Sequence, residues 1–344
     1  MTEAYDGRQV VGMDLHRRRS VLVRMTEDGR KLETVRIDNS PAALRAVLAR
    51  AGNSPRVVVE ATYGWYWAAD VLDAAGAEVH LAHPLGVKAF SYRRVKNDER
   101  DCADLADLLR LGRLPEAWIA PPPVRALREV TRYRLKLVQQ RTSCKDQVHA
   151  LLAKAGIPVT HSDIFGRTGG LWLDALALPQ PYAGKLASLR ALTAVLDGEI
   201  ARLEQQAAQM LAGDPGYAAI RQLPGIGPVL GAVICAEIGE PSRFGKPGQL
   251  CSWAGLTPRH YESDVKVIRG HVSKQGSRIL RWALTEAIQH QPPGTRPRQA
   301  KDAITARRGA GARSIAKTAA ARVLLTDVFY AMRDGHVRRA PAAA

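Results

Sequence analysis

The chain has 344 residues, 46% hydrophobic and 24% charged, which is enough for two or three domains that each bury a core. Its 50 Lys and Arg residues against 33 Asp and Glu residues give a formal net charge of +17. This excess favours a polyanionic partner, and nucleic acid is the commonest one. Charge that merely keeps the protein soluble is the simpler alternative.

The sequence shows no sign of secretion or of membrane insertion. It begins without a basic segment followed by an apolar one, and no uncharged apolar run approaches the roughly 20 residues of a membrane span. The four cysteines are far apart with no CxxC pair, and the nine histidines show no paired ligand spacing. This pattern argues against a zinc site or a disulfide framework. We therefore expect a cytoplasmic protein without a membrane partner.

The first 120 residues alternate between short β-branched runs and amphipathic segments. We expect strands at 9–16, 20–25, 31–38, 56–62 and 77–84, and helices at 40–52, 63–76 and 98–112. Three strands in a row, followed by helix, strand, helix and strand, predict a mixed α/β sheet with helices on its faces.

The sequence becomes helical after a proline-rich joint near residue 120. We expect a first domain at 1–123 and a helical spacer at 124–212, whose leucine and isoleucine spacing is compatible with a coiled coil to another protomer. A mostly helical domain should follow at 213–335, and a tail at 336–344.

Two apolar strands end in an acid, Asp14 in "VVGMDLH" and Glu60 in "VVVEAT". A carboxylate beside a core must find a compensating charge or become protonated, so this pattern is unusual. If both strands are central, the two acids lie side by side at one sheet edge. Asp98 and Asp101 share one face at the start of the next helix. Four converging carboxylates would suit Mg²⁺ or Mn²⁺ and phosphodiester chemistry, as in a ribonuclease-H-like fold.

The aspartates of that helix also have ordinary interpretations. Asp98 could cap the helix or lie in its first turn, and Asp101 could be a solvated surface residue. Asp104 and Asp107 continue the same spacing, so they obscure which pair is used.

Basic residues gather in three segments, 125–145, 259–281 and 296–313, which we expect to contact nucleic-acid backbones. The candidates in the first segment are Arg125, Arg128, Arg132, Arg134 and Lys136. Gly225 and Gly227 could expose backbone amides to a phosphate at a helix N-terminus, as in a helix-hairpin-helix motif, or simply form a tight turn. The aromatic residues Tyr63, Trp65, Tyr66 and Trp67 either contact nucleic acid or belong to a helix core.

Ser263 lies within "TPRHYESDVKVIRGHVSKQGSRILRW" at 257–282, and six basic residues surround it in the sequence: Arg259, Lys266, Arg269, Lys274, Arg278 and Arg281. From the residues alone it is either a loop serine or the group that attacks a phosphate. A serine hydroxyl needs a base or a metal to become nucleophilic, and His260 is the nearest histidine in the sequence.

The order of the motifs resembles one family. "GMD" at 12–14, "VEATYGWYW" at 59–67, "HPLGVKAF" at 83–90 and "KNDERDCADLADLL" at 96–109 resemble the N-terminal domain of DEDD-type transposases. "LPGIGPVLGAVICAEIGEPSRFGKPGQLCSWAGLTPRHYES" at 223–263 and "VSKQGSRILRWAL" at 272–284 resemble that family's second domain. The family is the IS110 group of bacterial insertion sequences, relatives of the Piv DNA invertase. The resemblance covers roughly residues 8–120 and 217–290.

This resemblance implies a RuvC-like N-terminal domain whose four metal-binding acids match Asp14, Glu60, Asp98 and Asp101. It places the family's nucleophilic serine on Ser263, with Arg259, Arg269, Lys274 and Arg278 available to bind phosphates. It also implies a recombinase guided by a bridge RNA that pairs with donor and target DNA. The family forms dimers that pair into tetramers, with the acids of one protomer facing the serine of another.

The sequence departs from the family after the serine, where small residues are usual and Asp264, Val265 and Lys266 stand here. The Asp264 carboxylate would either repel the phosphate or help to bind metal. Two other functions remain open. The first is a RuvC-like nuclease that cuts with metal-activated water, and the second is a non-catalytic nucleic-acid-binding protein whose acids are structural.

Overall fold

The computed structural model describes residue 5 and residues 7–90 and 97–338, except the side chain of Arg269. Residues 339–344 of the expected tail therefore lie outside the described part. The chain divides into two compact units, residues 1–119 and 120–344, and each is described by itself. The expected spacer and the expected C-terminal domain both fall within the second unit.

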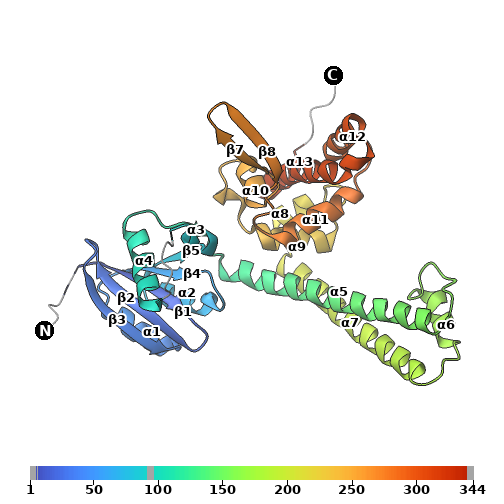
Figure 1. Cartoon of the computed structure of the whole chain (residues 1–344), viewed down its shortest axis with the longest axis horizontal. Helices are drawn as coiled ribbons and strands as arrows, with labels where there is room; N and C mark the ends of the chain where they lie inside the picture. Colours follow the sequence, from blue (N-terminus) through green and yellow to red (C-terminus); the bar gives the residue numbers. More distant parts are fainter. Residues whose placement is uncertain (1–4, 6, 91–96, 339–344) are drawn as a thin grey trace. The chain divides into compact units, whose positions relative to one another are not determined.

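A six-stranded sheet forms the centre of the first unit (Figure 1). The strand order is β3-β2-β1-β4-β5-β6, with β1 and β4 adjacent and parallel in the middle. The strands are β1 (Gln9–Leu15), β2 (Arg19–Thr26), β3 (Lys31–Asp38), β4 (Arg56–Glu60), β5 (Glu78–Ala82) and β6 (Glu116–Ala117). The mixed sheet and its first five strands confirm the sequence prediction, and the two-residue β6 is an addition.

Helices pack on both faces of this sheet. The helices are α1 (Pro41–Leu48), α2 (Trp65–Ala74), α3 (Pro84–Lys88) and α4 (Asp98–Arg110). One core joins Val11 and Met13 of β1 to Leu44 of α1 and Leu72 of α2. The core on the other face joins alternate residues of the strands to α4. The sheet is therefore the middle layer of three, and both faces of its central strands are buried.

The second unit begins with two long helices that pack side by side (Figure 1). α5 (Pro122–Lys154) and α7 (Tyr182–Met210) run antiparallel, because Arg134 pairs with Glu204 while Arg141 pairs with Asp197. α6 (Arg167–Asp174) packs at the far end of the pair. Much of the expected apolar face of α7 is buried against α5 of the same chain, although Leu192 remains 51% exposed.

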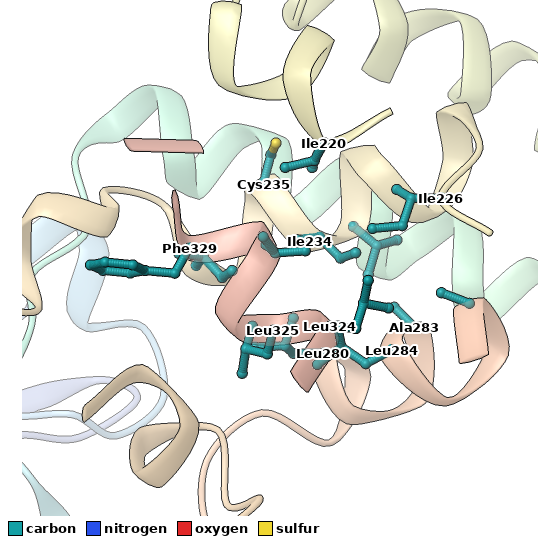
Figure 2. Close-up of a cluster of buried hydrophobic side chains, with 14 of the residues drawn as sticks. Ile220, Ile226, Ile234, Cys235, Leu280, Ala283, Leu284, Leu324, Leu325 and Phe329 are labelled. Atoms are coloured by element: carbon teal, nitrogen blue, oxygen red, sulfur yellow. The ribbon is translucent and has the colours of Figure 1, made fainter. Parts of the chain in front are cut away.

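The rest of the second unit is mostly helical, which also agrees with the prediction. Its elements are α8 (Pro215–Ile220), α9 (Pro228–Ile238), α10 (Pro247–Trp253), β7 (Pro258–Ser263), β8 (Lys266–Val272), α11 (Arg278–Gln289), α12 (Arg296–Arg308) and α13 (Arg313–Asp334), with short 3-10 turns at Pro241–Arg243 and Ala310–Ala312. Figure 2 shows how Ile234 of α9, Leu284 of α11 and Phe329 of α13 come together in one core. The β7–β8 hairpin that carries Ser263 follows α10, which contributes Leu250 and Cys251 to this core.

Candidate active site

Asp14 and Glu60 lie at the same edge of the first unit's sheet. In the parallel register of β1 and β4, Met13 is opposite Val59, so the next residues, Asp14 and Glu60, end neighbouring strands side by side. Side chains alternate along a strand, and Val10 and Val58 belong to the core under α4. Asp14 and Glu60 have the same parity as these valines, and both therefore face the α4 side of the sheet.

Gly12 sets the distance between β1 and α4. A Cβ atom at this position would lie 1.8 Å from the carbonyl oxygen of Cys102, so only glycine lets the helix backbone approach this closely. Cys102 is fully buried there, and its thiol donates to the carbonyl of Val21 at 3.2 Å. This contact brings the start of α4 to the acidic edge of the sheet.

The acids near Cys102 affect the pKa of its thiol. Burial, followed by the negative charges of Asp14, Asp101 and Asp98, raises the pKa of its thiol to about 12. The thiol is thus protonated and inert at neutral pH. The negative charges of three of the four predicted acids thus act on the thiol buried at the β1–α4 contact.

The first turn of α4 turns its acids in different directions. Asn97 caps the helix by accepting from the backbone N–H of Glu99 at 3.0 Å, so Asp98 is the first helical residue and not the cap. Glu99 turns to β3, where it accepts from Thr34 at 3.0 Å and pairs with Lys31. Further along, Asp107 pairs with Arg110 at 2.5 Å. Glu99 and Asp107 therefore each pair with a basic residue, Lys31 and Arg110 respectively.

A histidine joins two of the predicted acids. Nε2 of His16 lies 3.2 Å from Oδ2 of Asp14 and 3.3 Å from Oδ2 of Asp98, and one ligand atom of each residue lies within 4.8 Å of the others. Asp14 is only 13% exposed, whereas His16 and Asp98 are about half exposed. Glu60, at the neighbouring strand end, and Asp101, one helical turn away, lie outside this close group.

His16 was not predicted as a site residue, because the nine histidines show no paired ligand spacing with each other. The available signal was the Asp-x-His spacing at the end of the strand predicted at 9–16, since residues two apart in a strand share a face.

The close group suits a small divalent ion. Ligand atoms bound about 2.1 Å from an octahedral ion at right angles to each other are roughly 3 Å apart. The spacings of 3.2 Å and 3.3 Å around His16 are near this value. Two carboxylate oxygens and one imidazole nitrogen are also common ligands of divalent ions.

Ser263 lies in the second unit, at the tip of the β7–β8 hairpin. It is exposed and pairs directly across the hairpin with Lys266, so the two side chains share one face. Asp264 and Val265 form the turn, and Asp264 has a φ of 51°. Aspartate adopts this left-handed conformation more readily than most residues, which explains why it follows the serine.

Several side chains that lie near Ser263 in the sequence are exposed to solvent. His260 pairs with Glu262 at 3.3 Å, and strand alternation puts both on the face opposite Ser263. Arg259, Lys274 and Arg278 are exposed. The predicted contact of Arg269 concerns a side chain outside the described ones.

Arg281 has a structural role instead of an exposed one. It donates to the carbonyls of Ala254, Gln275 and Gly276 at 2.9–3.1 Å, and burial lowers its pKa. Arg281 therefore ties the chain segments before and after the hairpin to α11.

The two glycines before α9 differ in their surroundings. Gly225 has a φ of +82°, and a Cβ there would lie 2.2 Å from the carbonyl oxygen of Ala287 in α11. Its glycine identity is explained by packing. Gly227 is exposed at the N-cap of α9 with open space around it. A phosphate could approach the backbone at Gly227.

Most of the basic residues predicted as nucleic-acid contacts on α5 bind other parts of the protein. Arg125 is only 5% exposed. Arg128 donates to the carbonyls of Ala236 and Glu237 at the end of α9. Arg132 binds the buried Glu237 carboxylate through two hydrogen bonds of 2.8 Å and 3.0 Å. Arg134 binds Glu204, whereas Lys136 is exposed. These arginines tie α5 to α9 and α7.

The aromatic cluster after Glu60 is divided as well. Trp65 and Trp67 pack against the core of the first unit, and Tyr66 meets Trp65 edge to face at 4.5 Å between ring centroids. Tyr63 is 85% exposed. Only Tyr63 of the four is therefore largely open to solvent, three residues after Glu60.

Comparison with known proteins identifies the class. Residues 11–157 match a family model of DEDD transposases, described as "Transposase", and residues 217–301 match a second one, described as "Transposase IS116/IS110/IS902 family". The two models match both units in the expected order. The chain belongs to the IS110 family of transposases, a family whose DEDD class suggests dependence on a divalent metal.

Several named relatives agree with this family. The chain is 28% identical to the "Probable family 20 transposase" of Pseudomonas aeruginosa, over 64% of this chain and 65% of that relative. It is 24% identical to the "Transposase for insertion sequence element IS1328" of Yersinia enterocolitica, over 68% and 70%. It is 23% identical to the "Transposase for insertion sequence element IS1111A" of Coxiella burnetii, over 80% and 76%. The match to the Pseudomonas protein thus spans just under two thirds of that relative. Within the described ranges, no helix has the length and apolar character that crossing a bilayer requires.

Proposed function

We propose that this protein is a DNA transposase that cleaves and exchanges strands through four acids and one serine. The observation that carries the proposal is the contact of Gly12 with Cys102, which seats α4 on β1 and brings Asp98 to Asp14. Glu60 ends the adjacent parallel strand, and Asp101 follows one turn later on α4. A mixed sheet with acids at this edge is the basis for proposing a RuvC-like fold.

Asp14, Glu60, Asp98 and Asp101 would hold Mg²⁺ or Mn²⁺. When bound, the ion would stabilise negative charge on the oxygens of the phosphate that reacts. The low exposure of Asp14 strengthens its electrostatic interactions, because a buried charge is less screened by water. Asp98 is more exposed and would adjust to the incoming substrate.

Ser263 is the proposed nucleophile. Its Oγ would form a bond to phosphorus while the bond from phosphorus to one strand end breaks, and the proton lost by the serine is matched by one gained at the leaving hydroxyl. Because the phosphoserine keeps the energy of the phosphodiester, the reverse reaction can join strands without ATP. Lys266, across the hairpin, and the exposed Arg259 and Lys274 supply positive charge for the phosphate.

The partners we propose are donor DNA, target DNA and a guide RNA, the bridge RNA of the family. The net charge of +17 supports polyanionic partners. Lys136, Gly227 and Arg278 are exposed, as are most residues of 259–281 and many of 296–313, and these would contact the backbones. We also propose a homo-oligomer in which dimers pair into tetramers, with the exposed Leu192 on α7 as one point of a coiled-coil contact.

A cleavage assay tests the reaction that we propose. Purified full-length protein, with the RNA that co-purifies with it, should cut labelled element-end DNA in Mg²⁺ or Mn²⁺ and should be inactive in EDTA. Activity that persists in EDTA would refute the role of the acids. Cleavage that yields only free DNA ends, with no DNA attached to protein, would favour the water-using nuclease.

The guide is tested by sequencing the RNA that co-purifies with the protein. One structured RNA should dominate, and RNase treatment should abolish the choice of target. Affinity for duplex should fall with salt, with log K decreasing by about 0.9 per log unit of salt for each neutralised phosphate. Unchanged target choice after RNase would refute the guide.

A further inference from the structure

We infer that His16 is a ligand of the metal centre and that its nitrogen makes this centre prefer Mn²⁺ over Mg²⁺. The inference rests on the proposed metal-dependent function and adds a residue that the DEDD acids do not include. The observation behind it is that one ring nitrogen of His16, Nε2, faces the carboxylates of Asp14 and Asp98.

One nitrogen of His16 faces two carboxylates at once. Nε2 lies 3.2 Å from Asp14 and 3.3 Å from Asp98, on the side where α4 meets β1. These three residues come from the end of β1, the turn that follows it, and the first turn of α4. Convergence of one nitrogen and two carboxylates on one point is the arrangement of ligands around an ion.

A second histidine of the same sheet shows the contrasting arrangement. His80 of β5 also lies between two carboxylates, but it uses both nitrogens, Nε2 to Glu78 at 3.0 Å and Nδ1 to Glu116 at 3.2 Å. Its ring therefore bridges two acids that lie on opposite sides of it. A histidine between acids is thus not by itself a metal ligand, and His80 is a matched control.

The turn that carries His16 is held in place by hydrogen bonds. Asn39 donates from its side chain to the carbonyl of His16 at 2.6 Å and from its backbone to the carbonyl of Arg18 at 2.9 Å. Its side-chain oxygen accepts from the fully buried Ser20 hydroxyl at 2.6 Å. The backbone N–H of His16 donates to Arg19 across the turn at 3.1 Å. The backbone of His16 is therefore held in place, although its side chain is half exposed.

The kind of ligand decides the preference among ions. Mg²⁺ takes oxygen ligands in a strict octahedron and keeps several waters, so it gains little from an imidazole. Mn²⁺ binds carboxylates as Mg²⁺ does, but of the two it is the transition-metal ion, and imidazole nitrogen is a ligand of transition-metal ions. One nitrogen beside the Asp14 and Asp98 oxygens therefore favours Mn²⁺.

The test is electron spin-echo envelope modulation of Mn²⁺ bound to the full-length protein without nucleic acid. A directly bound imidazole nitrogen modulates the Mn²⁺ echo, whereas a histidine that only hydrogen-bonds to the acids does not give this coupling. Wild-type protein and His80→Gln should show the nitrogen modulation, and His16→Gln should lose it. Circular dichroism should show that all three proteins remain folded.

Calorimetric titration with each ion gives a second readout. His16→Gln should weaken Mn²⁺ binding at least about tenfold, since even outer-shell partners of metal sites contribute about 10–100-fold. His16→Asp, which makes the close group all-oxygen, should lower the ratio of Mn²⁺ to Mg²⁺ affinity. Asn39→Ala should weaken Mn²⁺ binding less than His16→Gln does, because it loosens the turn but keeps the His16 imidazole.

The outcomes separate the inference from the proposed function. Mn²⁺ that binds in a manner dependent on Asp14 but shows no nitrogen modulation would overturn the role of His16 and leave the metal centre intact. An unchanged Mn²⁺ to Mg²⁺ ratio in His16→Asp would overturn it as well. If Asp14→Ala changed the affinity for neither Mn²⁺ nor Mg²⁺, the metal centre itself would be overturned.

Discussion

The carbonyl oxygen of Cys102 occupies the space that a side chain at Gly12 would need, 1.8 Å from the ideal Cβ position. Through this contact β1 and α4 approach without an intervening side chain. The two ends of the contact carry Asp14, two residues after the glycine, and Asp98, four residues before the cysteine. The position of the acidic group therefore depends on a residue with no chemistry of its own.

Replacing Gly12 by alanine should damage both the fold of the first unit and its metal binding. The new methyl group would push the backbone of α4 away from β1, and such overpacking commonly costs about 1–3 kcal/mol. Asp98 would move with the helix, so Mn²⁺ affinity should fall as well. Urea unfolding and calorimetric Mn²⁺ titration measure the two effects.

The matched control is Gly198→Ala in the interior of α7, where nothing lies within 4 Å of the added Cβ. This change should stabilise the protein by roughly 0.5–1 kcal/mol, because alanine loses less backbone freedom than glycine on folding. Equal stability of Gly12→Ala and wild type would show that α4 does not depend on the close approach.

The acids of α4 should differ sharply in their effect on cleavage. Asp98→Ala and Asp101→Ala, like Asp14→Ala and Glu60→Ala, should reduce strand cleavage by more than the roughly 10–100-fold typical of outer-shell losses. Asp107→Ala should retain most activity, because the Asp107 carboxylate is bound to Arg110. Initial rates on labelled DNA decide this, and an inactive Asp107→Ala beside an active Asp98→Ala would mean that the wrong face of α4 was chosen.

Arg132 should be required for stability more than for nucleic-acid affinity. Its removal would leave the Glu237 carboxylate, which is 2% exposed, without its ion-pair partner. Breaking a buried pair from one side costs about 3–5 kcal/mol, and the partly exposed Arg132 places the expected loss towards the lower end. Urea unfolding of Arg132→Ala measures this loss.

Lys136→Ala is the control on the same helix, and its exposed position predicts a stability change within about 0.5 kcal/mol. Filter binding of both variants to duplex DNA completes the comparison. Arg132→Ala with normal stability and much weaker DNA binding would restore the nucleic-acid role that the sequence suggested.

The sequence predicted the features that repeat locally and missed those that depend on distant partners. Asp14 and Glu60 stood out because each ends an apolar strand, and the neighbouring parallel register of β1 and β4 confirms that they are adjacent. The basic run on α5 suggested a polyanion, yet Arg132 meets Glu237, which lies 105 residues away in the sequence. No local sequence pattern predicts such a partner.

Gly225 is likewise explained by a partner that is distant in the sequence. Its neighbours suggested a phosphate-binding turn, and the structure explains the glycine by the carbonyl of Ala287 in another helix. His16 was visible in the sequence, two residues after Asp14, but only the folded first turn of α4 shows why it matters.

Ser263→Ala should separate binding from chemistry. The basic side chains around the hairpin are unchanged in this variant, so binding to nucleic acid should remain near wild type while strand cleavage and the covalent complex are lost. Ser273→Ala changes the serine that directly follows β8, so it is the nearby serine control and should stay active. Gel shift and cleavage assays on the same DNA provide the comparison.

Mass spectrometry of the trapped protein–DNA complex tests the central claim most directly. The reaction is stopped with denaturant, the DNA is trimmed with nuclease, and the peptides are sequenced for an added nucleotide. We predict one phosphodiester-linked nucleotide on Ser263 at the exposed tip of the β7–β8 hairpin. A nucleotide on any other residue, or no adduct under conditions that give cleavage, would contradict the serine mechanism.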